Sequence, residues 1–291
     1  MFKTPIRAKF VSRLERINDQ LCFAAFGRHE LGALFALHVE SSPEDYSTQV
    51  FPANPYAGRI YRKMKDIPSF AAVSDEIELQ MVVISGGEHA LAYIVEIEKF
   101  RSKLLPSPAD AIARDAPEDQ IFDKMSQWAG ALPPRGDYRT LGFLRLLRNH
   151  YAHVNEAPSP AFAAYLAQHA HHLQSFWNNG VTHLGNFRFR TLIDAPLTAE
   201  DAFAIMNLLR VVIEHVDASF AATLSLDAVL PEVTAHLIAT RPGHDRTPAR
   251  LSPKVRAAIE HDYGCKFGID EIRSRVEACF ATARRVSRTG K

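Results

Sequence analysis

Helical periodicity that is interrupted again and again by proline is the sequence feature that most limits the fold of this chain. Apolar residues recur at intervals of three and four over long stretches, as they do in amphipathic helices. Proline and glycine signals close these stretches. In chain order, we expect helices over 5–38, 75–105, 117–129, 138–155, 159–178 and 198–224, and two or three more within 226–291. The sequence therefore predicts an all-α protein, built as a multi-helix bundle.

Three segments fit this scheme less simply. Four prolines between residues 43 and 68 predict an irregular connection. Residues 77–83 alternate between apolar and polar side chains like a strand, and Gly86-Gly87 could break the helix or permit a close helix contact, so a short strand stays open there. Residues 187–190 also alternate, which leaves open a small β-hairpin within 181–197. We still expect helix over most of the chain.

Composition and charge indicate an ordinary globular protein. The chain has 291 residues, of which 47% are hydrophobic and 23% charged, so a sizeable core is expected. The net charge of +1 lacks the basic excess that is typical of nucleic-acid-binding proteins, although it is compatible with a local basic site. Three widely spaced cysteines imply no disulfide framework. The most apolar long stretch, 202–224, carries Arg210, Glu214 and Asp217, which makes it too polar to cross a membrane.

From these features we expect a cytoplasmic protein with no signal peptide and no contact with a membrane. We expect three parts along the chain. Residues 1–70 hold an N-terminal helix and its irregular connection, 71–225 a helical core, and 226–291 a helical C-terminal extension.

Arginine followed five residues later by histidine is the spacing with the most chemical interest. It occurs four times, as Arg145/His150, Arg148/His153, Arg210/His215 and Arg256/His261. Spacing alone cannot choose among these pairs, so their helical context has to decide.

The helix expected over 138–155 has a clear apolar stripe. It consists of Leu141, Leu144, Leu147, Tyr151 and Val154, which should face the core. Asn149 and His153 lie roughly opposite the stripe, and Arg145 lies beside them. Arg148 lies on the flank of the helix, where its long side chain can extend toward the core or toward solvent. His153 should therefore be exposed, whereas His150 lies closer to the core edge.

The two later pairs favour structural interpretations. Arg210 and His215 enclose three apolar residues inside a strongly apolar helix, where a satisfied buried polar pair is the more natural interpretation. Arg256 and His261 belong to a charged segment that should be exposed.

The hexapeptide Arg148-Asn149-His150-Tyr151-Ala152-His153 resembles the signature of HEPN-domain proteins, with Arg, then Asn, then His near the end of a long helix. The helices between 75 and 224 also suit a HEPN bundle in number and length. The resemblance implies cleavage of RNA without a metal or other cofactor, in which the 2′-hydroxyl of the RNA is the nucleophile. It also implies a homodimer in which two motifs face one cleft, and a role as a toxin or antiviral effector with an antitoxin or other defence partner.

The resemblance implies a role for each motif residue. His153 would be the general acid/base, because the pKa of imidazole lies near neutrality. Arg148 would stabilise charge on the phosphoryl oxygens with its rigid fork of donors. Asn149 would position the imidazole or a phosphate. As supporting residues we name Arg145, Tyr151 and Glu88, the last because a polar residue from a neighbouring helix often joins such sites.

Several alternatives stay open. The motif could belong to a HEPN-like module that binds a partner without catalysis. His169 and His172 on one helix could contribute to a zinc site, although no HExxH pattern is present. The dipeptides at 244–245 and 261–262 could indicate a metal-dependent phosphohydrolase. Basic residues among aromatics at 56–65, or the basic tail after Arg273, could contact RNA.

Overall fold

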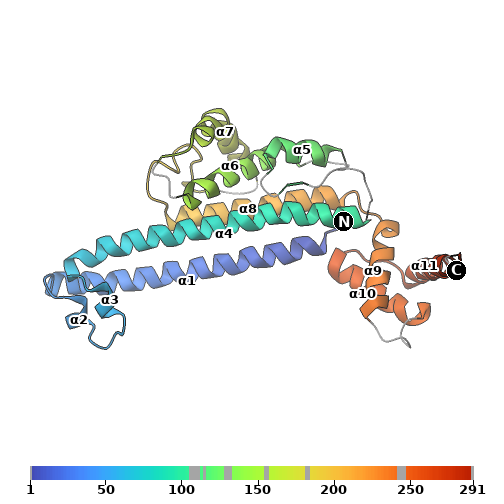
Figure 1. Cartoon of the computed structure of the whole chain (residues 1–291), viewed down its shortest axis with the longest axis horizontal. Helices are drawn as coiled ribbons and strands as arrows, with labels where there is room; N and C mark the ends of the chain where they lie inside the picture. Colours follow the sequence, from blue (N-terminus) through green and yellow to red (C-terminus); the bar gives the residue numbers. More distant parts are fainter. Residues whose placement is uncertain are drawn as a thin grey trace. The chain divides into compact units, whose positions relative to one another are not determined.

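The computed structural model describes residues 2–104, 112–113, 116–127, 133–153, 157–180, 184–240 and 247–289, with side chains to residue 280 (Figure 1). Helices account for most of these residues. In chain order they are α1 (Pro5–Ser41), α2 (Ser47–Val50), α3 (Ala57–Ile60), η1 (Met64–Asp66), α4 (Ile67–Leu104), α5 (Glu118–Ser126), α6 (Arg135–Ala152), α7 (Pro160–Asn178), α8 (Ala199–Ala221), α9 (Leu226–Thr240), α10 (Pro248–Tyr263) and α11 (Ile269–Thr289). An isolated bridge joins Tyr46 to Lys63, and these ranges contain no strand. The all-α prediction is confirmed.

Helix α4 is longer than expected and passes through both glycines without a break. The strand interpretation of 77–83 is wrong, and the reason lies in the two faces of the helix. Leu79 and Val83, four residues apart, are buried, whereas Ile77 and Met81, also four apart, are exposed. Two apolar stripes on opposite faces of one helix imitate the alternation of a strand.

Of the loop and the small β-hairpin left open within 181–197, residues 184–197 form a loop with turns; residues 181–183 lie outside the described ranges. Phe187 and Phe189 are both buried, with ring centroids 5.0 Å apart. The N–H of Phe189 donates to the side-chain oxygen of Gln174 at 3.3 Å rather than to a neighbouring strand. The alternation therefore reflects a loop that anchors two rings in the core.

Local sequence signals fix several helix ends. The hydroxyl of Thr198 accepts from the N–H of Asp201, and the carboxylate of Asp201 accepts from the N–H of Thr198, both at 3.1 Å. This reciprocal capping begins α8, as the sequence predicts. Ser159 caps α7 by accepting from the N–H of Phe162 at 3.2 Å. Helix α10 ends at Gly264, whose φ of 72° suits glycine.

The chain divides into two compact units, each built from separate segments. The first unit contains Met1–Ser12, Ala90–Gly142 and Val211–Lys291; the second contains Arg13–His89 and Phe143–Arg210. The division into 1–70, 71–225 and 226–291 remains a prediction.

The core of the first unit surrounds a buried carboxylate on α8. Asp217 is 1% exposed and accepts from the N–H of Thr4 at 3.1 Å, from the hydroxyl of Thr4, and from the hydroxyl of Tyr93 at 3.1 Å. Burial raises the pKa of Asp217, and these donors oppose the rise. Around this network, the Phe100 ring lies 6.1 Å from that of Phe220. The network ties the start of α1 and the second half of α4 to α8.

In the part of the chain that the structure describes, no helix is both long and apolar enough to span a membrane.

Candidate functional site

Packing in the second unit sets the rotation of α6, the helix that carries the motif. Phe143 is fully buried, with its ring 5.9 Å from Phe162 on α7 and 5.0 Å from Phe189. Leu144 and Leu147 are buried beside it, as the apolar stripe predicts. Because this face is fixed in the core, residues on the opposite face of α6 are directed outward.

Two adjacent glycines on α4 lie against neighbouring helices, and the first of them allows the closer approach. A Cβ at Gly86 would lie 2.4 Å from the Met206 side chain on α8. A Cβ at Gly87 would lie 3.4 Å from Cβ of Arg148 on α6. Of the two outcomes left open by the sequence, close helix contact is the one observed.

This approach places Arg148 beside Glu88. The guanidinium Nε lies 3.1 Å from a carboxylate oxygen of Glu88, and the two side chains are 16% and 30% exposed. A partly buried ion pair of this kind holds both groups in one orientation. The structure thus brings together two predicted site residues from different helices, and Arg145 lies half-buried on α6.

His153 lies directly after the last residue of α6, and its side chain is exposed. Its backbone N–H donates to the carbonyl of Asn149 at 3.1 Å, which continues the helical hydrogen-bond pattern by one residue. Asn149 is half-buried. The helix ends three residues earlier than expected, and Val154 lies outside the described ranges. The exposure of His153 agrees with the helical wheel.

His150 and Tyr151 face the interior of the second unit. The His150 ring lies 6.0 Å from Phe162, and burial lowers the pKa of His150. Burial raises the pKa of Tyr151 well above its usual range, and Asp201 and Glu76 add to the rise. Tyr151 therefore keeps its proton at neutral pH, so it can donate a hydrogen bond but cannot serve as a base.

Among the described residues, no group of three or more His, Cys, Asp or Glu side chains is arranged so that it could hold a metal ion. His169 packs against Tyr165, with ring centroids 4.6 Å apart, and His172 is exposed. His261 pairs with the adjacent Asp262 at 2.7 Å on the surface. His244 and Asp245 lie outside the described ranges.

The basic and aromatic segment 56–65 has structural contacts. Lys63 and Lys65 lie 2.7 and 2.6 Å from the carboxylate of Glu44. Hydrogen bonds from these two lysines lower the pKa of Glu44 to about 2. Tyr61 stacks on Tyr46, with ring centroids 4.6 Å apart. These contacts hold the connection between α1 and α4 together.

The first unit holds an acid–base pair that the sequence interpretation missed. Asp137, in the first turn of α6, is completely buried, and its oxygens lie 3.0 and 3.1 Å from Nδ1 of His215 on α8. The His215 side chain is 45% exposed. Burial raises the pKa of Asp137 to about 6, and His215 opposes the rise.

A sequence signal for this pair existed. Asp137 lies four residues before Leu141 and seven before Leu144, so it is an acidic residue on a buried apolar stripe. The interpretation of Arg210 and His215 as a satisfied buried polar pair is wrong, because both residues are exposed and His215 pairs with Asp137. Arg210 instead donates to Asn207 at 2.9 Å.

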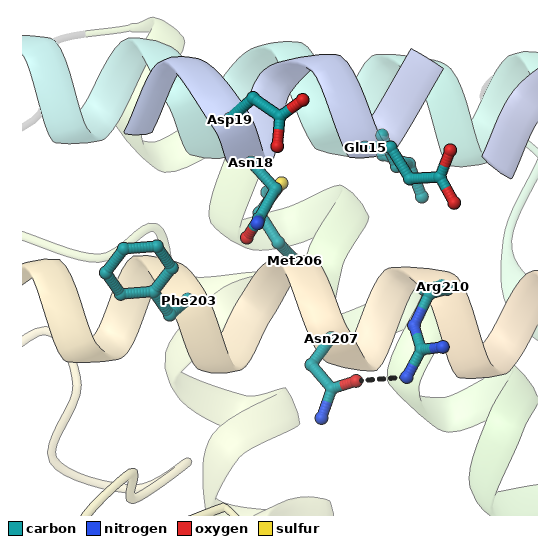
Figure 2. A pocket seen from close by; sticks show the side chains of 8 residues that line it. Glu15, Asn18, Asp19, Phe203, Met206, Asn207 and Arg210 are labelled. Carbon is teal, nitrogen blue, oxygen red and sulfur yellow. Dashed lines mark hydrogen bonds between the residues drawn. The ribbon is translucent and has the colours of Figure 1, made fainter. Parts of the chain in front are cut away.

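Figure 2 shows a groove in the second unit, between α1 and α8, of about 400 Å³. Its polar lining consists of Glu15, Asn18 and Asp19 from α1 and Asn207 and Arg210 from α8. Figure 2 also shows Arg210 bonded to Asn207 along one edge. The motif residues do not line this groove, which is therefore separate from the candidate site.

Comparisons of the chain with models of known protein families, with curated proteins and with solved structures give no match.

Proposed function

We propose that the chain is a metal-independent endoribonuclease of the HEPN type. The observation that carries the proposal is the end of α6, where exposed His153 lies five residues beyond an arginine that Glu88 orients. A general acid/base must be accessible to its substrate, whereas a phosphate-binding arginine benefits from being held in place.

The proposed reaction is an internal transesterification of RNA. The 2′-hydroxyl oxygen forms a bond to the adjacent phosphorus, and the bond from phosphorus to the 5′ oxygen breaks. The products are a 2′,3′-cyclic phosphate and a 5′-hydroxyl. His153 takes the proton of the 2′-hydroxyl or gives one to the leaving oxygen, and Arg148 stabilises charge on the phosphoryl oxygens. Asn149, one turn before His153, positions the imidazole or a phosphate.

One imidazole serves only one of these proton transfers in a given step. The other falls to water or to the His153 of a second copy. The homodimer with two motifs in one cleft therefore remains a prediction, together with an antitoxin or other defence partner. If the protein is a toxin, its expression should arrest bacterial growth, and His153→Ala should relieve the arrest.

Purified protein incubated with total RNA in EDTA tests the proposal. We expect cleavage by the wild type, loss of cleavage in His153→Ala, and unchanged cleavage in His172→Ala, which removes another exposed histidine. Helicity should be equal in all three proteins. Equal cleavage by wild type and His153→Ala would contradict the assignment of His153.

The ion pair of Arg148 also favours a second function, a non-catalytic HEPN-like binding module. Its side chain is only 16% exposed, and its guanidinium is already next to a carboxylate. This function predicts no RNA cleavage under any condition, and His153→Ala would then alter only association with a partner.

A further inference from the structure

The paired ends of α1 and α4 form a helical hairpin without a buried interior. They run side by side toward α2 and α3 (Figure 1), and Arg28 on α1 bonds Glu78 on α4 at 2.9 Å. Between Cys22 and Ser41, and between Pro68 and Glu78, no side chain is buried. Yet these segments are rich in large apolar residues. Helices with so much apolar surface normally bury it against a partner.

The exposed apolar residues of α4 form one continuous stripe. Phe70, Val73, Ile77 and Met81 are 45% to 59% exposed and follow one another at spacings of three, four and four residues. At 100° per residue they fall within about 80° of one another around the helix. Half-buried Ile84 continues the same line. We name these five residues, Phe70, Val73, Ile77, Met81 and Ile84, the α4 stripe, and none of them is charged.

The spacing of the α4 stripe is symmetric about Ile77. If a second copy of the helix lies antiparallel with its two-fold axis at Ile77, Val73 faces the partner's Met81 and Phe70 faces the partner's Ile84. Each apolar residue then meets another apolar residue. A two-fold interface needs this self-complementarity, because the same surface serves both copies.

Helix α1 has a similar stripe of exposed apolar residues, but the residue at its centre is charged. Phe23, Phe26, Leu34 and Leu37 are exposed on one side of the helix, and Glu30 lies midway among them. The Glu30 side chain is 63% exposed and contacts only its neighbour His29 among the ion pairs resolved in the described residues. An antiparallel pair about this point would bring two carboxylates together, which disfavours self-association through α1.

The area of the α4 stripe fits a second copy, and the charges around it disfavour an anionic membrane. Its exposed side chains supply roughly 400 Å² of apolar surface, close to the apolar share of the ~800 Å² that each partner buries in an interface of standard size. The same hairpin carries one arginine and five carboxylates, namely Arg28, Glu30, Glu40, Asp75, Glu76 and Glu78. Such an acidic excess opposes docking on an anionic membrane.

We propose that the chain forms an antiparallel homodimer through the α4 stripe, with the two-fold axis at Ile77. The interface is independent of RNA cleavage. Glu88 lies 11 residues beyond Ile77, so the two copies of Glu88 stand about 33 Å apart along the paired helices at 1.5 Å per residue. This dimer therefore does not join two motifs in one cleft.

Sedimentation equilibrium of the full chain gives the first test. The wild type should have at least twice the 32.5 kDa mass of one chain, and Ile77→Glu, which imitates Glu30, should have half the mass of the wild type, whether or not the motif dimer also forms. Phe26→Glu is the matched control, because it places the same charge on the α1 stripe, and it should keep the wild-type mass. A monomeric wild type, an Ile77→Glu protein of wild-type mass or a Phe26→Glu protein of half that mass would each overturn the proposal.

Disulfide trapping tests the register. Under mild oxidation Ile77→Cys should form a covalent dimer with itself. Val73→Cys should form one only when mixed with Met81→Cys. The wild type, which contains exposed Cys22, provides the background. Val73→Cys that traps itself as efficiently as Ile77→Cys would indicate parallel helices and contradict the two-fold axis at Ile77.

Discussion

The two ends of helix α4 have similar amounts of apolar surface and opposite surroundings. Toward its C-terminus Tyr93, Ile94 and Ile97 are at most 2% exposed, whereas toward its N-terminus Phe70 and Ile77 are about half exposed. Tyr93 meets the Phe10 ring at 5.6 Å and the carboxylate of Asp217 at 3.1 Å. The difference lies in what covers the helix. Apolar composition shows that a surface needs a partner, but it does not say whether that partner belongs to the same chain.

The largest expected effect on stability comes from replacing a buried isoleucine at one end of α4, compared with an exposed isoleucine at the other end. Ile97→Ala should lower the free energy of unfolding by about 2–5 kcal/mol, because it leaves a cavity in the core. Ile77→Ala should change the stability of the monomer by only about 0.5 kcal/mol, because its site is exposed. Urea unfolding at several protein concentrations measures both. The midpoint of Ile77→Ala should depend on concentration less than that of the wild type, since the dimer is weakened.

A buried carboxylate provides the next effect. The pKa of Asp137 is about 6 in the folded protein, against an ordinary 3.8. Between these pH values the folded state retains a proton that the unfolded state has released, so stability falls as the pH rises from 4 to above 6. The loss is roughly 3 kcal/mol at most. Urea unfolding across this range should show the loss in the wild type and not in Asp137→Asn; parallel curves for the two proteins would contradict it.

The two glycines of α4 give a smaller contrast. Gly87→Ala should stabilise the protein by about 0.5–1 kcal/mol, because alanine favours helix and its Cβ would make an ordinary contact with Arg148. Gly86→Ala gains the same propensity but must displace Met206 and Leu209, whose side chains approach within 3 Å of the new Cβ. Thermal unfolding should therefore rank Gly87→Ala above Gly86→Ala. The reverse order would contradict the assignment of the tight helix contact to Gly86.

The smallest effect concerns the exposed connection beside the hairpin. Lys63 and Lys65 lower the pKa of Glu44 to about 2 from an ordinary 4.5. A carboxyl with a lowered folded pKa stabilises the protein above pH 4.5, and the benefit is lost as the pH falls toward 2. Glu44→Gln should be slightly less stable than the wild type at pH 7, and the difference should shrink with acid and with salt. A difference that grows in acid would contradict the ion pairs.

Helices could be predicted from the sequence because their signals are local. Thr198 with Asp201 marks the start of α8, and the stripe of Leu141, Leu144 and Leu147 gives the buried face of α6. Residues 77–83 were correctly expected to be helical, but they left a short strand open because both faces of α4 are apolar. Two apolar stripes on one helix then produce the same alternation as a strand. Only the contacts that each face makes can distinguish the helix from the strand.

Contacts between distant residues were harder to foresee. Asp137 and His215 are 78 positions apart, so their pairing depends on how α6 meets α8. Glu88 could be named only as a polar group on a neighbouring helix, and its contact with Arg148 depends on how α4 meets α6. The exposure of His153 needed only the wheel of one helix, and it was predicted for that reason.

Cleavage of matched oligonucleotides in EDTA tests the proposed function most directly. The substrates are one RNA, the same RNA with 2′-O-methyl groups, and the DNA of the same sequence. The account predicts that the wild type cuts only the unmodified RNA, leaves 2′,3′-cyclic phosphate ends, and loses this activity in His153→Ala. Cleavage of the 2′-O-methyl RNA or the DNA, or full activity of His153→Ala, would contradict it.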